Sequence, residues 1–253
     1  MATESTLKLM IFPPSPWSEK ARWALDVAGL GYQLIEHVPM VSNLRARQLA
    51  GNFNPLRKFS LPIAACGAQV MDDSYSIASY AADHNKNANV DLFPQDKLTE
   101  IQYWNDLSNR MMNILRKRAL PAMKTNQTLL ESNLPPLVPE ALRPHLTSVS
   151  KMAISYIDRK YPLSEEDTEQ VVIEGFETLR KALNQADGDY LLGEFSYADI
   201  AMAVTLQPVK PVADKYIPLD SGTRECWTDD MLIEQFPDLI EWRDRIYQHH
   251  RSA

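Results

Sequence analysis

The strand-like segments of this 253-residue chain are confined to its first third. Two short β-rich runs flank a helical stretch, and two more are separated by a turn at Cys66-Gly67, where glycine permits a positive φ. The runs are 7–12, 32–38, 62–65 and 69–72. This order is typical of a βαβ unit followed by a hairpin. From about residue 97 onward, apolar residues recur only at helical spacing.

This division predicts two domains. An α/β domain is expected over residues 1–85 and an all-helical domain over 95–253, with the polar and unpatterned stretch 85–91 between them. Several prolines between Thr125 and Pro144 predict a long connection within the helical part, because proline cannot continue a helix.

Composition and charge disfavour several classes of protein. The 45% hydrophobic content is that of an ordinary globular protein, and the net charge of −7 argues against a nucleic-acid or anionic-membrane surface, which would be basic. The first residues lack the pattern of a signal peptide, and no run approaches the roughly 18 apolar residues of a membrane span, so a soluble cytoplasmic protein is expected. Cys66 and Cys226 stand too far apart for a Cys-x-x-Cys pair. The histidines show no metal-ligand spacing, so no metal is expected.

The segment from Phe12 to Arg22 carries the strongest chemical signal, because a strand-like run breaks there into a helix with hydroxyls at its start. Ser15 suits the N-cap, and Pro16 suits the first helical position, where its missing amide costs nothing. Taken alone, this is an ordinary helix start. However, the free amides and the positive end of the helix dipole would point toward Ser15, so the segment also predicts an anion site that a thiolate would fit.

Three further motifs are modest when taken singly. Phe59-Ser60-Leu61-Pro62 precedes a strand-like run, and proline is tolerated at the start of a strand. Asp73-Ser74 begins a second helix and could be no more than its cap. Near the C-terminus, Ser196 and Asp199 have the spacing of a capping box, which predicts a structural role for this pair.

The order and spacing of these motifs resemble those of the glutathione transferase superfamily. Members of its serine type carry Ser-Pro-x-Ser at the first helix, a proline opening the third strand, Asp/Glu-Ser-x-x-Ile after the hairpin and Gly-x-x-Ser/Thr-x-Ala-Asp-Ile in the helical domain. The matching segments here begin at Ser15, Pro62, Asp73 and Gly193, and Phe236–Trp242 resembles the last long helix. The resemblance implies an α/β thioredoxin-like N-terminal domain followed by an all-α C-terminal helical bundle.

The resemblance also implies a glutathione site. Ser15 would lie beside the glutathione sulfur and favour its thiolate, while Ser18 takes the place of the second cysteine of glutaredoxin-like relatives. Leu61, followed by a Pro62 expected to be cis, would offer its backbone to the cysteinyl unit. The remaining implied contacts are Asp73 for the γ-glutamyl ammonium, Ser74 for its carboxylate and, in Asn54-Pro55-Leu56-Arg57-Lys58, Lys58 in preference to Arg57 for the glycyl carboxylate.

The implied reaction is attack of the bound thiolate on a small hydrophobic electrophile, or an isomerisation or dehalogenation by the same thiolate. The absence of a tyrosine at the end of the first strand disfavours a tyrosine-type enzyme, and the absence of cysteine at Ser15 and Ser18 disfavours a thioltransferase. Residues expected to contact the electrophile are Trp17, Trp104, Ser108 and Met111, although core packing explains most of them. A non-catalytic ligand-binding member and a scaffold subunit stay open as alternatives. The resemblance further implies a homodimer that serves in detoxification.

Overall fold

The computed structural model describes residues 6–39, 41–52, 54, 58–186 and 188–251. The described N-terminal part forms a four-stranded sheet in the order β2-β1-β3-β4. Strands β1 and β2 are parallel, whereas β3 runs antiparallel to both of its neighbours. The elements are β1 (Lys8–Ile11), α1 (Pro16–Val27), β2 (Gln33–Glu36), α2 (Asn43–Leu49), β3 (Ile63–Cys66), β4 (Gln69–Met71) and α3 (Ser74–Asp83).

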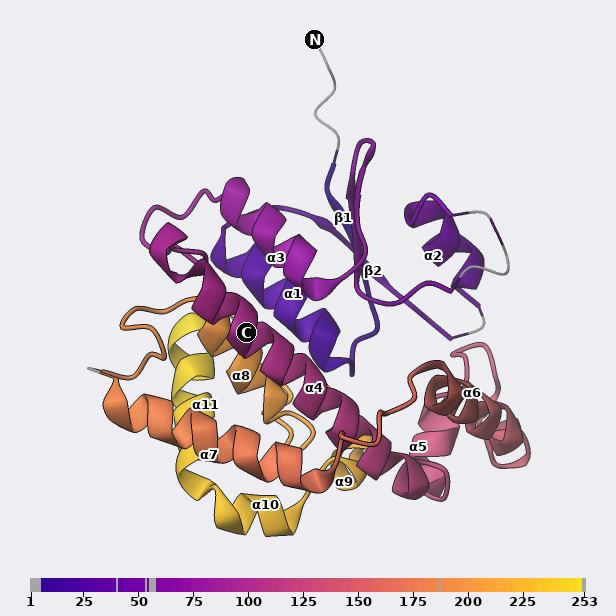
Figure 1. Cartoon of the computed structure of the whole chain (residues 1–253). Helices are drawn as coiled ribbons and strands as arrows, with labels where there is room; N and C mark the ends of the chain where they lie inside the picture. The colour runs from indigo at the N-terminus through magenta and orange to yellow at the C-terminus, as the bar shows by residue number, and fades with distance from the viewer. Residues whose placement is uncertain (1–5, 40, 53, 55–57, 187, 252–253) are drawn as a thin grey trace.

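Alternation of side chains along β1 gives the sheet two buried faces. Leu9 and Ile11 belong to the large hydrophobic cluster that also contains the buried faces of α1 and α3. Met10 points to the opposite face, where it packs with Ile63 and with Ala46 of α2. Helices α1 and α3 therefore lie side by side on one face of the sheet, and α2 covers the other (Figure 1).

The remainder of the described chain is helical and is organised around α4 (Leu98–Met123), the longest helix (Figure 1). Helix α8 (Tyr197–Thr205) is buried along its whole length and packs against both α1 and α4, so it connects the sheet-bearing part to the helical part. The other helices are η1 (Gln95–Lys97), α5 (Gln127–Ser132), η2 (Glu140–His145), α6 (Thr147–Lys160), α7 (Glu169–Gln185), α9 (Ser221–Cys226), α10 (Asp230–Gln235) and α11 (Pro237–His250). Among the described helices, none combines the length and the apolar character needed to cross a membrane.

The expected fold class is confirmed: a small mixed sheet with helices on both faces is followed by helices alone. The capping box at the start of α8 is also confirmed, because Asp199 accepts hydrogen bonds from the Ser196 amide at 2.9 Å and from the Ser196 hydroxyl at 3.1 Å. The extents of the two domains stay a prediction.

Several short helices were not expected from the sequence. The proline-rich connection contains α5 and η2, because Asn126 caps α5 through the Leu129 amide, and Leu129 and Leu130 pack in a small cluster with Ile154 of α6. Helix α2 lies between the second and third strand-like runs, where no helix was predicted. A helix of six or seven residues leaves too few turns for its periodicity to be recognised.

Candidate functional site

Three loops that carry sequence motifs meet at one edge of the sheet. Because β3 is antiparallel to β1, with Ile63 opposite Met10, the end of β1 lies beside the start of β3. Because β4 is antiparallel to β3, with Met71 opposite Ala64, the end of β4 reaches the same edge. The segments after β1, before β3 and after β4 are therefore neighbours, and they carry Ser15, Leu61-Pro62 and Asp73-Ser74 respectively.

The two serine hydroxyls at the start of α1 differ in their hydrogen bonding. Ser15 occupies the N-cap position with Pro16 following it, and its side chain makes no capping hydrogen bond. The Ser15 amide donates to the Phe12 carbonyl at 2.8 Å, which closes the turn after β1. Ser18 is buried, and its Oγ accepts the Phe12 amide at 3.1 Å. The Ser18 hydroxyl is thus used to hold the turn, whereas that of Ser15 is not used for capping.

The other two loops present different groups to this edge. The Leu61–Pro62 peptide bond is cis, as expected, and Leu61 precedes the first residue that pairs in the ladder with β1. Asp73 caps α3 by accepting the Ser76 amide at 2.8 Å and is exposed, while Ser74 is buried. Lys58 is exposed. Arg57, together with residues 55 and 56 of its motif, lies outside the described residues.

A buried lysine next to this edge was not predicted from the sequence. Lys20 of α1 is fully buried, and its Nζ donates to Asn109 Oδ1 at 2.9 Å and to Asn105 Oδ1 at 3.2 Å, both on α4. Burial lowers the pKa of Lys20 to about 7, although the charges of Asp73 and Asp106 act in the opposite direction. Its position between Trp17 and Ala24 on the apolar face of the helix was the available signal.

A chain of contacts leads from the start of α1 to the end of α6. The Trp17 indole N–H donates to Asn109 Oδ1 at 3.0 Å, and the Arg116 guanidinium carbon of α4 lies 5.1 Å from the Trp17 ring centroid. The same carbon lies 4.4 Å from the ring centroid of Tyr161. The Tyr161 hydroxyl is in turn 2.8 Å from the hydroxyl of Ser60, just before Leu61-Pro62. Arg116 and Tyr161 were not identified from the sequence.

The other residues expected to contact an electrophile lie in the interior. Trp104 and Met111 belong to the main core cluster, and a Cβ placed on Gly175 of α7 would meet the Met111 sulfur at 2.4 Å. Ser108 is fully buried, and its hydroxyl donates to the Ala201 carbonyl of α8 at 2.9 Å. Helix packing therefore accounts for all three, and of the expected group only Trp17 lies beside the described edge.

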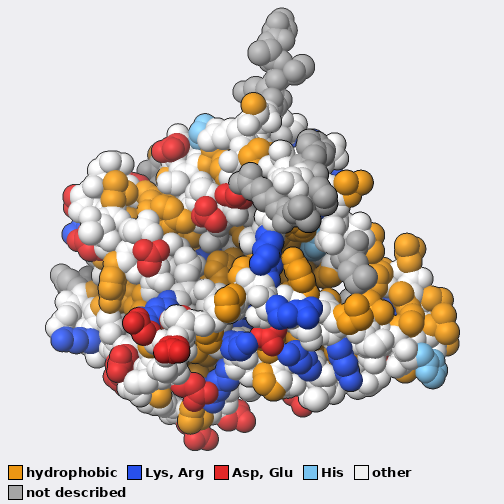
Figure 2. Space-filling model, turned by 45° about the vertical axis from the view of Figure 1, so that its right-hand side comes forward, with side chains coloured by type: hydrophobic (Ala, Val, Ile, Leu, Met, Phe, Trp, Pro, Cys, Tyr) orange, Lys and Arg blue, Asp and Glu red, His pale blue; other side chains and the backbone are white. Residues whose placement is uncertain are grey.

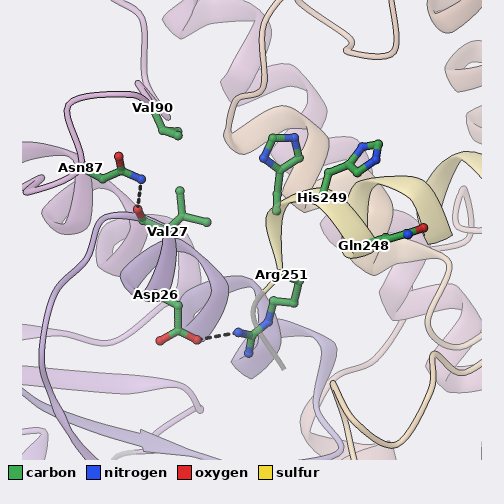
Figure 3. A pocket seen from close by; sticks show the side chains of 8 residues that line it. Asp26, Val27, Asn87, Val90, Gln248, His249 and Arg251 are labelled. Atoms are coloured by element: carbon green, nitrogen blue, oxygen red, sulfur yellow. Dashed lines mark hydrogen bonds and ion pairs between the residues drawn. The ribbon is translucent and has the colours of Figure 1, made fainter.

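A hollow of about 410 Å³ lies near the opposite end of α1 (Figure 3). Its lining includes Asp26 and Asn87 on one side and His249 on the other. Asp26 follows Ser15 by eleven positions along the helix, which corresponds to about 16 Å along its axis. This hollow is therefore distinct from the edge where the motifs meet. Among the described residues, no three His, Cys, Asp or Glu side chains gather in a way that could hold a metal ion.

Comparison with known proteins agrees with this architecture. Residues 14–84 match the family model for the N-terminal domain of glutathione S-transferase. No curated protein is significantly similar to the chain in sequence. The match agrees with the expected superfamily: residues 14–84 resemble the N-terminal domain of glutathione S-transferases, and the chain as a whole has a thioredoxin-like part followed by an all-helical part.

Solved structures of low sequence identity share the fold over almost their full length. A glutathione S-transferase from Methylobacillus flagellatus, with glutathione bound, is 15% identical with a TM-score of 0.57, and the match covers 96% of each chain. The beta-etherase LigF from a Sphingobium species is 19% identical with a TM-score of 0.56, over 96% of this chain and 95% of its own. A maleylacetoacetate isomerase from Anaeromyxobacter dehalogenans, with glutathione bound, is 15% identical with a TM-score of 0.51, over 97% and 92%.

Proposed function

We propose that the chain binds glutathione at the edge where the three loops meet and uses the glutathione thiolate to attack a small hydrophobic electrophile. The observation that carries this proposal is the convergence of Ser15, Leu61-Pro62 and Asp73-Ser74 from three separate segments. The presence of glutathione in two of the solved structures with this fold supports it.

Each part of the tripeptide has a suitable partner in this proposal. The Leu61 backbone, which lies outside the ladder, pairs with the cysteinyl unit, and Lys58 binds the glycyl carboxylate. The buried Ser74 hydroxyl donates to the γ-glutamyl carboxylate, and Asp73 binds its ammonium. The Ser15 hydroxyl then lies beside the sulfur, at the positive end of α1.

The energetics of thiolate formation are within reach of one hydroxyl. Lowering a thiol pKa from about 8.5 to below 7 requires roughly 2 kcal/mol, and a hydrogen bond to a charged group contributes about 1.5–3 kcal/mol. The thiolate then forms a carbon–sulfur bond with the electrophile, and the leaving group departs with its bonding electron pair. An isomerisation or a dehalogenation would begin with the same thiolate.

The test is an ultraviolet titration of the thiolate in the complex of the full chain with glutathione. A transferase should depress the thiol pKa of bound glutathione, and turnover of a chlorinated dinitroaromatic electrophile should follow. Binding with an ordinary thiol pKa would identify a non-catalytic ligand-binding protein. If the chain is not retained on immobilised glutathione, the proposed site is refuted and a scaffold role is favoured.

A further inference from the structure

We propose that Arg116 is a specificity-determining residue, which binds the carboxylate of a planar electrophile stacked between the start of α1 and the end of α6. This inference deepens the proposed function and rests on it for the identity of the reaction. It assigns the substrate class as aromatic or conjugated electrophiles that carry a carboxylate.

The Arg116 guanidinium lies against two aromatic rings. Arg116 lies over the rings of Trp17 and Tyr161, which come from two different parts of the chain. Aromatic faces of this kind also hold planar ligands by stacking. The site for the electrophile would therefore be walled by apolar rings and would contain a fixed positive charge.

Arg116 forms no direct ion pair with a described carboxylate, although the charge of Asp158 acts on it from farther away. Among the described residues, no Asp or Glu oxygen forms an ion pair with Arg116, whose guanidinium donates a hydrogen bond to Asn113 Oδ1 at 2.9 Å. That bond uses one of five N–H donors. Other cations of α4 are paired: Arg110 with Asp167 at 2.7 Å, Arg118 with Asp229 at 3.1 Å and Lys117 with Asp158.

The Arg116 side chain is partly withdrawn from solvent. Arg116 is half-buried, and burial lowers the pKa of its guanidinium from the usual value, although the group remains charged at neutral pH. A partly desolvated guanidinium with unused donors binds a carboxylate strongly, because its planar fork can form two parallel hydrogen bonds. The nearby carboxylate of Asp158 acts on Arg116 without forming an ion pair with it and is itself paired with Lys117 and Lys124, so a bound carboxylate would supply the direct ion pair that Arg116 lacks.

The two rings that Arg116 contacts lie close to the edge where the three loops meet. Trp17 follows Ser15 by two residues, and the Tyr161 hydroxyl is hydrogen-bonded to Ser60 beside Leu61-Pro62. A ring placed against Trp17 and Tyr161 would thus lie next to the proposed thiolate. Lys160, which donates to the Phe59 carbonyl and lies 4.7 Å from the Tyr161 ring centroid, adds positive charge on the same side.

Although the chain has a net charge of −7, the face drawn in Figure 2 shows several Lys and Arg side chains close together, with hydrophobic and some acidic side chains among them. A local positive field raises the encounter rate with anionic ligands even when the net charge of the protein is negative.

Binding of two unreactive ring compounds of the same shape tests the inference without any turnover. The full chain, loaded with glutathione, is titrated calorimetrically with dinitrobenzoate and with the neutral dinitrobenzamide. We expect the carboxylate to bind at least about tenfold tighter than the amide, the ratio expected from one charge-assisted contact. The substitution Arg116→Gln should reduce this preference to within about twofold, and Arg116→Lys should retain part of it.

The matched control is Arg110→Gln, on the same helix but already paired with Asp167, which should leave the preference unchanged. If Arg116→Gln fails to fold, the wild-type preference must still decline with added salt, as a charge-based preference does. Equal binding of both compounds by the wild type overturns the inference. A loss of glutathione affinity in Arg116→Gln overturns it as well, because Arg116 would then belong to the glycyl end of the tripeptide.

Kinetics distinguish failure of this inference from failure of the proposed function. With the chlorinated forms of the same two compounds, Arg116→Gln should lower kcat/KM for the carboxylate about tenfold and leave the amide within about twofold. If the carboxylate binds selectively but neither compound is turned over, the anion site stands and the transferase activity does not. If both are turned over equally well by the wild type, the transferase stands and the anion site does not.

Discussion

At the scale of single residues, the candidate site depends on the different hydrogen bonding of two nearby serines. Both hydroxyls occur in Ser15-Pro16-Trp17-Ser18, and both suit a helix start. Ser18 is committed to the turn after β1 through the Phe12 amide, while Ser15 makes no capping hydrogen bond. Ser15 is therefore the better candidate for interaction with a ligand sulfur.

Removal of the Ser15 hydroxyl should affect chemistry and spare binding. In Ser15→Ala we expect kcat for a generic electrophile to fall about tenfold to a hundredfold, with the dissociation constant for glutathione nearly unchanged, because the lost hydrogen bond acts on the thiolate alone. Steady-state kinetics and calorimetry measure the two quantities. Ser18→Ala should instead lower the melting temperature. If Ser18→Ala abolishes turnover with a normal melting temperature, the roles of the two serines are reversed.

At the scale of elements, polar side chains buried between helices hold the two parts of the molecule together. Lys20 links α1 to α4 through Asn105 and Asn109, while Ser108 links α4 to α8. A buried charge is costly, so the protonation of Lys20 should be coupled to folding.

Stability should therefore depend on pH through Lys20. The pKa of Lys20 is about 7 in the folded chain and about 10.4 in an unfolded one, so between these values the unfolded state holds the extra proton. The free energy of unfolding should rise with pH across this window, by at most about 5 kcal/mol from this group. Urea denaturation at several pH values should show the rise, and the difference between wild type and Lys20→Met isolates it. Parallel pH profiles for the two proteins would contradict this assignment.

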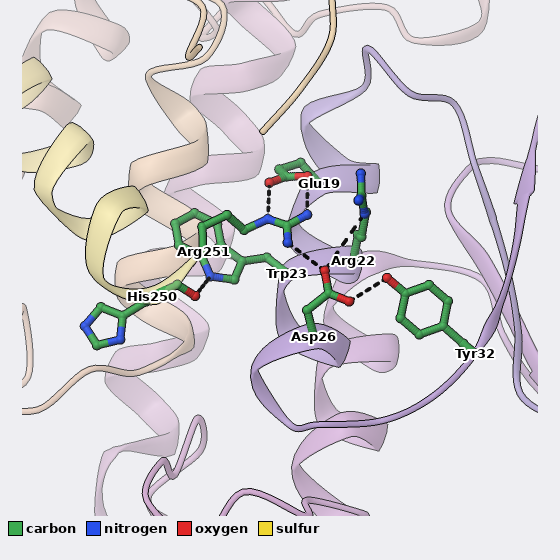
Figure 4. A network of polar contacts seen from close by, with 7 residues as sticks. All are labelled: Glu19, Arg22, Trp23, Asp26, Tyr32, His250 and Arg251. Atoms are coloured by element: carbon green, nitrogen blue, oxygen red, sulfur yellow. Dashed lines mark hydrogen bonds and ion pairs between the residues drawn. The ribbon is translucent and has the colours of Figure 1, made fainter. Parts of the chain in front are cut away.

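At the scale of the whole molecule, the C-terminal residues close onto the first helix. Arg251, which follows α11, is buried and binds Glu19 at 2.7 Å and Asp26 at 2.6 Å (Figure 4). Although burial acts to lower it, the carboxylates of Glu19 and Asp26 hold the pKa of Arg251 above its usual value. The Trp23 indole N–H donates to the His250 carbonyl at 2.8 Å, which adds a second tie.

Breaking this buried pair should destabilise the whole chain. Arg251→Met should reduce the free energy of unfolding by roughly 3–5 kcal/mol, because Glu19 is left charged and buried. Arg245→Met is the matched control, since Arg245 makes an exposed pair with Asp189 and should cost less than about 1 kcal/mol. Urea denaturation measures both. In Glu19→Gln the further loss from Arg251→Met should be smaller, and equal losses at Arg251 and Arg245 would refute a structural role for the pair.

At the same scale, we propose that the chain assembles into a two-fold homodimer. The surfaces expected to contribute are residues 65–80 and 104–110. Val70 within the first is 40% exposed, and Tyr103 beside the second is 52% exposed, which suits a self-complementary contact. Light scattering at micromolar concentration should give about twice the mass of one chain. A single species with the mass of one chain would overturn the proposal, and Val70→Asp should weaken a genuine dimer.

The sequence alone determined whatever depends on neighbours along the chain. The cap of α3 by Asp73, the Ser196–Asp199 capping box and the glycine turn between β3 and β4 follow from local chemistry. The division into a sheet and a helical part follows from periodicity. Short helices such as α5 were not predicted, because the burial of Leu129 and Leu130 depends on distant partners.

Only the tertiary structure decided which side chains meet across the chain. Lys20 reaches Asn105 over 85 positions, and Arg251 reaches Glu19 over 232. Nor could the sequence place Arg116 between Trp17 and Tyr161, because a charged residue on a long helix is by default predicted to be solvated. Burial and partner choice are properties of packing between helices, and packing brings together residues whose separation along the sequence carries no periodic signal.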